Sequence, residues 1–344
     1  MNKSKNNQRG LFDEQFRLEA LSKQNDPLEK LLAMIPWNVF KKTLKSIFKK
    51  ERKTTSGRPP YKYVMMFKIL ILQRLYNLSD NQMQFQIMDR LSFMRFLDLG
   101  LKDRIPDEKT IWLFRDTLTK SKKIETLFND FNATLYEGGL IAKSGNMIDA
   151  SFIEAPKQRN SREENKKVKK GETPEDWKEN PNKLCQKDLD ARWTKKNNET
   201  HFGYKNHVKV DKDSKLIKKY VVTSASVHDS QPLEELVDED DSKQKLYADS
   251  AYSGQPIKDV LKDLKIKNMI HEKGARNNPL TEKQKKKNKK KSKIRARVEH
   301  VFAFMEMSMN GMTIRSIGLK RANGIIGLMN IAYNMRRFVS LQNA

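Results

Sequence analysis

Apolar residues change their spacing near Gly145, and this change constrains the fold more than any other feature of the sequence. Between residues 26 and 140 the apolar side chains recur every three or four positions, as they do at Tyr63–Tyr76, and this period is typical of helices. Residues 146–155 instead alternate between apolar and polar side chains, as a half-buried strand does. The sequence therefore predicts a helical N-terminal region followed by a region built on a β-sheet.

The second region contains further strand-like and helical runs, in an order that predicts a mixed sheet flanked by helices. Two of the strand-like runs are separated by the turn residues 211–214 and predict a hairpin. The strand-like runs lie at residues 201–210, 216–224, 246–249 and 266–271, and the helical runs lie at residues 256–264, 294–309 and 325–338. The expected fold class is thus mixed α/β, preceded by an all-helical N-terminal domain.

The stretch 157–200 does not look like a packed segment, because half of its residues are charged. A segment with so few apolar side chains cannot bury enough surface to offset the entropy lost on ordering. We therefore expect a surface insertion that is partly disordered. Residues 1–25 are polar as well, and we expect them to form a mobile lead.

The chain of 344 residues carries 69 Lys and Arg against 43 Asp and Glu, and its formal net charge is +26. Such a charge excludes an ordinary metabolic enzyme as the default interpretation and favours a polyanionic partner, most commonly nucleic acid. The single cysteine, Cys185, excludes an intrachain disulfide framework and a cysteine-rich zinc module. The apolar runs are too short to span a membrane and the N-terminus has no secretory signal, so we expect a cytoplasmic protein outside the membrane.

Three carboxylates stand on separate predicted elements and could meet in space. Asp149 lies within the first strand, Asp249 at the end of a later strand and Glu299 on a helix. If the two strands are neighbours, about 4.8 Å apart, their side chains could share or bridge divalent metal ions. Oxygen ligands without a thiolate favour Mg²⁺ or Mn²⁺, and two such ions can stabilise an in-line phosphoryl displacement. The three acids are therefore candidate catalytic and metal-binding residues.

Each of these acids also has a simpler interpretation. Asp249 precedes a turn, and an aspartate in this position is more often a turn former than a metal ligand. Glu299, taken alone, is typical of a solvated helix. Asp149 is the most informative, because a carboxylate between Ile148 and Ala150 is costly to bury unless it is paired or bound to a metal.

Basic residues near these acids are candidates for DNA contacts. Arg295 lies four residues before Glu299, on the same helix face, where it could pair with that carboxylate or bind a scissile phosphate. Arg297 points elsewhere and could contact backbone phosphate. Lys205, on the predicted hairpin, is a further candidate phosphate contact. The lysine-rich run 283–293 would lie at the same end of the helix as Arg295 and strengthens this interpretation.

Five short blocks of sequence follow one another along the second region. They are Ile148-Asp149-Ala150-Ser151, Phe202-Gly203-Tyr204-Lys205-Asn206-His207, Ala225-Ser226-Val227-His228-Asp229-Ser230, Tyr247-Ala248-Asp249-Ser250-Ala251-Tyr252 and Arg295-Ala296-Arg297-Val298-Glu299-His300-Val301-Phe302. Their order resembles that of bacterial insertion-sequence DDE transposases, of the branch typified by insertion sequence five. The resemblance covers residues 10–340 apart from the charged insertion. One such block is weakly specific, whereas five in order are strongly specific.

This resemblance implies an RNase H-like catalytic domain whose DDE triad is Asp149, Asp249 and Glu299. It implies a metal-dependent polynucleotidyl transferase, with Mg²⁺ or Mn²⁺, that acts as an endonuclease at the ends of its own element. The freed 3′-hydroxyls are then joined to target DNA without a covalent protein–DNA intermediate. Arg295 matches the arginine that precedes the family's glutamate.

The chain departs from the family pattern at one position. Family members often carry a lysine seven residues after the glutamate, where this chain has Glu306. The DNA contact expected from that lysine would then have to come from another basic residue, such as Arg315 or Lys320.

We therefore expect a transposase with a polar lead at 1–25, a helical DNA-binding domain at 26–140 and an RNase H-like catalytic domain at 141–344 that includes the insertion at 157–200. The helical domain could instead serve support or dimerisation. The expected DNA partner is double-stranded, both as terminal inverted repeats and as target. A second copy of the chain is also expected, because two element ends must be brought together. When bound to DNA, the protein would associate with the nucleoid. Two alternatives remain: a decayed, non-catalytic protein that binds element ends, and a metal-dependent DNA nuclease without strand joining.

Overall fold

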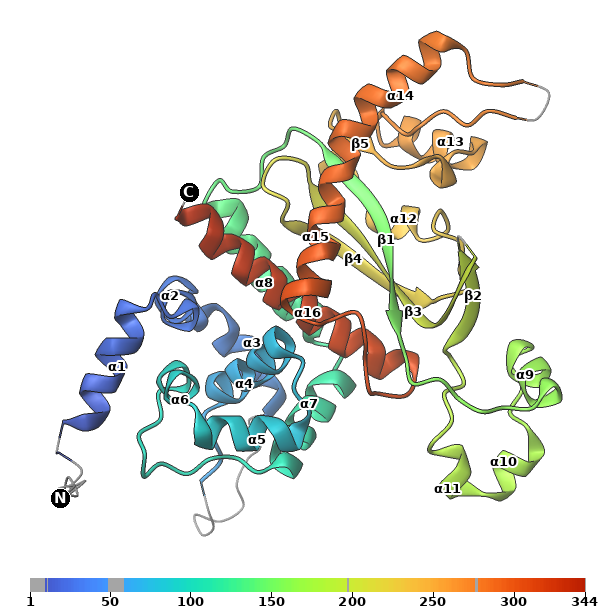
Figure 1. Cartoon of the computed structure of the whole chain (residues 1–344). Coiled ribbons are helices and arrows are strands. Elements are labelled where there is room, and N and C mark those ends of the chain that lie inside the picture. The colour runs from blue at the N-terminus through green and yellow to red at the C-terminus, as the bar shows by residue number, and fades with distance from the viewer. Residues whose placement is uncertain (1–9, 11, 49–58, 197, 276–277, 344) are drawn as a thin grey trace, which may run out of the picture.

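The computed structural model describes residues 10, 12–48, 59–196, 198–275 and 278–343. Its N-terminal region is helical, and its second region is built on a sheet flanked by helices (Figure 1). The helices of the first region are α1 (Asp13–Lys23), α2 (Pro27–Met34), α3 (Lys41–Phe48), α4 (Tyr63–Tyr76), α5 (Asp80–Asp89), α6 (Leu91–Leu97), α7 (Glu108–Lys120) and α8 (Ile124–Glu137). The predicted mixed α/β fold class with an all-helical N-terminal part is confirmed.

The ends of these helices follow local sequence signals. The Ser79 hydroxyl accepts from the backbone N–H of Gln82, whose side chain in turn accepts from Ser79 N–H, so α5 begins with a capping box. Asp107 caps α7 by accepting from the Thr110 N–H. Asn77 ends α4 in the left-handed conformation, which asparagine tolerates better than most residues.

Part of the predicted mobile lead at 1–25 is ordered. The prediction is therefore wrong for Asp13–Lys23, which form a helix. Helix α1 occupies Asp13–Lys23, whereas residues 1–9 and 11 lie outside the described residues. The Arg95 guanidinium on α6 donates to the Leu18 carbonyl and to the Ser22 hydroxyl. These contacts come from residues more than seventy positions away, which local polarity cannot reveal.

The sheet is mixed, and its pairing places distant segments next to one another. Strand β1 pairs antiparallel with β3 and parallel with β5; β3 also pairs antiparallel with β2 and with β4, and β5 pairs parallel with β6. The strands are β1 (Asn146–Glu154), β2 (Arg192–Lys196), β3 (Glu199–Asp211), β4 (Ile217–Ser224), β5 (Lys245–Tyr247) and β6 (Lys267–Asn268). The predicted hairpin is β3–β4, and β1 lies in the middle of the sheet.

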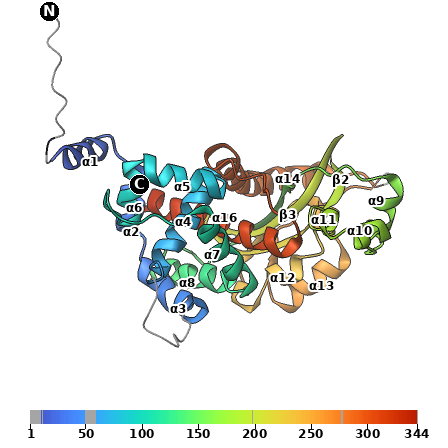
Figure 2. The same ribbon diagram turned by 90° about the horizontal axis from the view of Figure 1, so that it is seen from below.

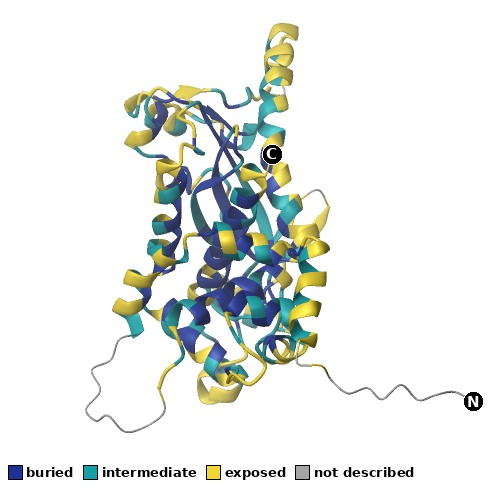
Figure 3. Cartoon of the chain, turned by 90° about the vertical axis from the view of Figure 1, so that its left-hand side faces the viewer, coloured by how far each residue is buried: buried dark blue, intermediate teal, exposed yellow. Residues whose placement is uncertain are grey.

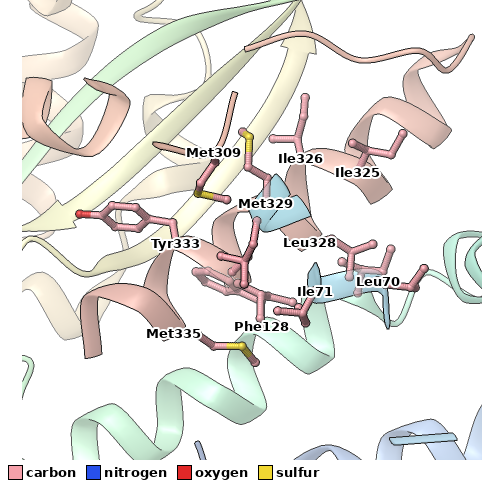
Figure 4. Close-up of a cluster of buried hydrophobic side chains, with 14 of the residues drawn as sticks. Leu70, Ile71, Phe128, Met309, Ile325, Ile326, Leu328, Met329, Tyr333 and Met335 are labelled. Atoms are coloured by element: carbon pink, nitrogen blue, oxygen red, sulfur yellow. The ribbon is translucent and has the colours of Figure 1, made fainter. Parts of the chain in front are cut away.

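Helices cover both faces of this sheet. On one face Ile148 packs with apolar residues of α12 (Leu233–Leu236) and α13 (Gln255–Asp263). On the other face the long helix α16 (Leu319–Gln342) packs against α4, α7, α8 and strand β4. Figure 4 shows Leu70 and Ile71 of α4 and Phe128 of α8 beside Leu328 of α16. One buried core therefore crosses the predicted domain boundary at 140/141.

The charged insertion folds, which corrects the expectation of partial disorder for its described residues. It carries α9 (Arg162–Lys169), α10 (Glu175–Glu179) and α11 (Pro181–Leu184) and ends in β2, and these helices lie at the opposite end of the molecule from α1 (Figure 2). Trp177 is fully buried and its indole N–H donates to Glu164. A single large aromatic side chain thus supplies a small local core that overall composition conceals.

The lysine-rich run is helical and precedes the predicted helix at 294–309. Helix α14 (Glu282–Arg295) begins at a capping box on Thr281 and continues through a 3₁₀ turn, Ala296–Val298, into α15 (Glu299–Ala303) and a π-helical turn, Phe304–Ser308. Its residues are partly or fully exposed, and it projects from a body whose buried residues concentrate in the middle (Figure 3). Among the described residues, none of the helices combines the length and apolar character that crossing a bilayer requires.

Candidate active site

The pairing of β1 with β5 brings Asp149 and Asp249 to the same level of the sheet. Asn146 lies opposite Leu246 and Met147 opposite Tyr247, an offset of one hundred residues that extends to the two aspartates just beyond the end of β5. Each carboxylate accepts a backbone hydrogen bond close to it in sequence: Asp149 from Ala150 N–H at 2.9 Å and Asp249 from Ala251 N–H at 2.8 Å. Asp249 thus has the turn-forming role considered from the sequence, and it also neighbours Asp149.

Burial dominates the electrostatics of Asp149. The side chain is 15% exposed, and its pKa is raised from 3.8 to about 6. Burial is the main cause and the negative charge of Asp249 adds to it, whereas the Ala150 hydrogen bond and the Arg295 charge oppose the rise. Two neighbouring carboxylates, one of them buried, form a site that favours a cation.

Arg295 connects Asp149 to Glu299. Its guanidinium donates to the Asp149 carboxylate at 3.0 Å and to the Glu299 carboxylate at 2.8 Å. Arg295 ends α14 and Glu299 begins α15 one helical turn later, so both side chains point to the same side. Of the two roles considered for Arg295, the i,i+4 pair is therefore present, and a phosphate contact stays a prediction.

The three acids do not converge as tightly as the sequence led us to expect. Among the residues that the structure describes, no group of three or more His, Cys, Asp or Glu side chains is close enough to hold a metal ion. The physical reason is that the Arg295 guanidinium neutralises Asp149 and draws Glu299, 61% exposed, towards itself. Asp149 and Asp249 fit a divalent cation as an adjacent pair of oxygen ligands. Glu299 could join them only by leaving Arg295.

The other two candidate DNA contacts occupy different surroundings. Lys205 is buried, and its ammonium group donates to the Asp229 carboxylate and to the Val227 carbonyl, each at 2.7 Å. This internal pairing does not favour the predicted phosphate contact. Arg297 is exposed and donates to the Lys212 carbonyl at 3.2 Å, at the end of the β3–β4 hairpin, so it points away from the aspartates.

Two residues near the site were not singled out from the sequence. Tyr252 is fully buried, and its hydroxyl has no hydrogen-bond partner among the described residues. Burial raises the pKa of Tyr252, and the charges of Asp149 and Asp249 raise it further. Lys196, the last residue of β2, lowers the pKa of Asp149, and its ammonium lies 5.6 Å from the Phe152 ring. The position of Tyr252 three residues after Asp249 was the available signal for it; the contact of Lys196 depends on the fold of the insertion.

The departure at Glu306 falls on the π-helical turn after α15, where its side chain is exposed. Arg315, one of the suggested replacements, donates instead to the backbone carbonyl and the side-chain oxygen of Asn77 at the end of α4. The segment that carries Arg315 is therefore in contact with the N-terminal helices.

Comparison with known proteins gives matches over both regions. A family model described as a transposase DDE domain matches residues 142–335, which is more than half of the chain. A second model, described as a transposase domain of the DUF772 type, matches residues 16–117. A solved structure described as a piggyBac transposase synaptic complex with hairpin DNA, determined by cryo-EM, has a TM-score of 0.44 and 13% sequence identity to this chain, and the match covers 92% of this chain and 75% of that chain.

Proposed function

Because the chain belongs to the family of transposase DDE domains, we propose that it cuts DNA at the ends of its own insertion element and joins the freed 3′-hydroxyls to target DNA. We further propose that it belongs to the bacterial branch typified by insertion sequence five. The family implies nuclease and polynucleotidyl transferase activity, generally with divalent metal ions. The mixed sheet flanked by helices has the RNase H-like fold of such domains.

The observation that carries this proposal is the parallel register of β1 with β5, which sets Asp149 beside Asp249, with Arg295 joining Asp149 to Glu299. These three carboxylates are the proposed catalytic residues and metal ligands, and Mg²⁺ or Mn²⁺ is the proposed ion. A bound divalent ion would stabilise the charge that develops on the attacking and leaving oxygens. The raised pKa of Asp149 is the expected state of a carboxylate placed to receive such an ion.

The proposed reaction consists of two phosphoryl transfers. In the first, a water oxygen attacks the phosphorus at the element end, the bond to the 3′ oxygen breaks, and a 3′-hydroxyl is released. In the second, this hydroxyl attacks a target phosphodiester, whose own 3′ oxygen leaves. Arg295 would orient a non-bridging phosphate oxygen once the DNA competes for its guanidinium, because two parallel N–H donors match that geometry.

The proposed DNA partner is double-stranded, as terminal inverted repeats and as target. The net charge of +26 and the lysine-rich helix α14 support phosphate contacts, and Arg297 stays a proposed contact on the same connected helix. The helical region 26–140 is the proposed end-binding domain. A homodimer on DNA, a cytoplasmic location and association with the nucleoid complete the proposal.

The test is incubation of the purified chain with Mg²⁺ and DNA that carries the repeats flanking its own gene. Joined products that contain target DNA support the proposal. Asp149→Asn should abolish both steps and leave DNA binding intact, whereas Asp259→Asn, a matched change at an exposed aspartate on α13, should keep full activity. Hydrolysed ends without joined products would instead identify a nuclease. Binding without any cleavage would identify a decayed binder of element ends.

A further inference from the structure

A second basic site lies away from the candidate active site, where the N-terminal helices meet the start of α16. Here a cavity of about 360 Å³ is formed by α4, α5, α7, the segment 315–317 and α16. We call it the arginine cavity. The side chains that matter for its charge are Arg74, Asp80, Trp112, Arg115, Arg315 and Arg321.

The acidic groups at the arginine cavity are already paired. Arg115 binds both carboxylate oxygens of Asp80, at 2.5 and 2.6 Å. Arg321 lies 3.6 Å from the Asp116 carboxylate, but Lys120 already binds that carboxylate at 2.7 Å. Both nearby carboxylates therefore form their close ion pairs with other cations, although the charge of Asp80 still acts on Arg74 from a longer range.

Arg74 and Arg315 have no carboxylate partner among the described residues. Among these residues, Arg315 donates only to the oxygens of Asn77. Within the part of the chain that the structure describes, Arg74 makes neither a close ion pair nor a hydrogen bond, and it interacts with Asp80 only at longer range. The pKa of Arg74 is lowered to about 10, chiefly by burial and also by the charges of Arg115 and Arg315, while the charge of Asp80 opposes this shift. Four guanidinium groups thus line the cavity with Asp80, whose carboxylate is bound by Arg115, and this excess of positive charge around half-buried Arg74 is an unfavourable arrangement that a bound anion would relieve.

The segment that supplies Arg315 also connects the arginine cavity to the strand of Asp149. The Glu154 N–H donates to the Met312 carbonyl, and the Ile314 N–H donates to the Glu154 carbonyl. Glu154 ends β1, five residues beyond Asp149, which corresponds to roughly 17 Å at the ~3.3 Å rise of a strand. The segment that carries Arg315 is therefore hydrogen-bonded to the far end of the strand that carries Asp149.

We propose that the arginine cavity binds a phosphate group of the DNA strand that runs from the candidate active site, with Arg74 and Arg315 as its principal contacts. Arginine suits this role because its planar donors match two phosphate oxygens at once. This inference rests on the proposed function, since it names a contact for the same DNA. Asn77 holds Arg315 at the mouth of the site through hydrogen bonds that leave its remaining donors for the phosphate.

The test measures fluorescence anisotropy of a labelled DNA duplex of arbitrary sequence against salt concentration, with the full chain in chelator. Each phosphate contact contributes about −0.9 to the slope of log K against log salt. Arg74→Gln and Arg315→Gln should each flatten the slope by about one and weaken binding about tenfold at low salt. Arg315→Lys, which keeps the charge, should retain most of the slope. Arg17→Gln, on an exposed part of α1 that does not line the cavity, is the matched control and should change neither quantity.

A second arm distinguishes free phosphate from a DNA strand. Trp112 lines the arginine cavity and is 45% exposed, so its fluorescence should report occupancy. Duplex DNA should change the emission of the wild-type chain; the change should be much smaller in Trp112→Phe, and in Arg74→Gln it should require about tenfold more DNA. Saturation by inorganic phosphate, with no response to DNA, would overturn the inference in favour of a free-phosphate site.

The outcomes separate this inference from the proposed function. If the wild-type chain binds DNA and both Arg→Gln variants show the same salt slope as the wild type, the proposed phosphate contact is overturned but the proposed function is not. An equal loss in Arg17→Gln also overturns the phosphate contact, because the effect would then be one of net charge. Failure of the wild-type chain to bind DNA overturns the proposed function as well. Thermal unfolding checks that Arg74→Gln is folded. If it is not, Arg315→Gln still tests the phosphate contact, because Arg315 lies outside the helices and its replacement disturbs the fold less.

Discussion

The buried carboxylate of Asp149 should make the metal-free protein less stable than its inactive amide variant. Burial raises the pKa of Asp149 from 3.8 to about 6, so at neutral pH the folded chain carries an ionised group that it would hold more favourably in the neutral form. Two pKa units correspond to roughly 3 kcal/mol. An amide resembles the protonated carboxyl in size and lacks its charge, so Asp149→Asn should recover up to that amount.

The sign of the pH dependence follows from the direction of the shift. A raised pKa means that the folded state binds the proton more tightly than the unfolded chain, so wild-type stability falls as the pH rises from about 4 to 6. The difference between Asp149→Asn and the wild type should therefore vanish below about pH 4 and reach its full size above pH 6. Arg295 keeps its hydrogen bond to Glu299 in the variant, so that pair is not lost.

The assay is thermal unfolding in chelator at several pH values, followed by the same series in Mg²⁺. For domains of 150–250 residues, 1 kcal/mol shifts the melting temperature by roughly 2–4 °C, so the variant should melt on the order of 5 °C higher at pH 7.5. Mg²⁺ should stabilise the wild type more than the variant, because the ion binds the folded carboxylates. A variant that melts lower than the wild type at pH 7.5 in chelator would refute the reasoning.

Three further expectations concern the scaffold. Burial lowers the pKa of His207 from 6.5 to about 4, so the free energy of unfolding should fall by up to ~3 kcal/mol as the pH drops from 6.5 to 4. Urea titrations of His207→Gln should not show this part of the pH dependence. If the variant loses as much stability on acidification as the wild type, the reasoning is refuted. Trp177→Ala should cost roughly 3–5 kcal/mol of local stability and expose the insertion to limited proteolysis while the rest of the chain stays protected; unchanged proteolysis would contradict this. A Cβ on Gly203, where φ is +149°, would lie 2.3 Å from the Ile153 carbonyl oxygen. Gly203→Ala should therefore lower the free energy of unfolding, measured in urea, by about 2 kcal/mol or more. The control Gly254→Ala, at a position with room for a Cβ, should stay close to wild type.

Local patterns in the sequence were sufficient for most elements of the fold. The helix at Tyr63–Tyr76, the caps at Ser79 and Asp107 and the β3–β4 hairpin depend on residues a few positions apart, whose spacing and side-chain chemistry determine the backbone. The anomaly of an acid inside the apolar strand β1 likewise identified Asp149 as the most informative candidate. The insertion was mispredicted because its core depends on one tryptophan rather than on composition.

Contacts over long sequence separations needed the tertiary structure. The sequence by itself determined the element types, the positive charge and the candidate acids, because these depend on residue identity and short-range periodicity. Only the folded chain decided that Arg295 would bind Asp149 across 146 positions, that Lys205 would be paired internally with Asp229, and that Arg74 would be left without a carboxylate. Those outcomes depend on how separate elements pack, and the free energy of a charged side chain is governed by neighbours that the packing brings within a few ångströms.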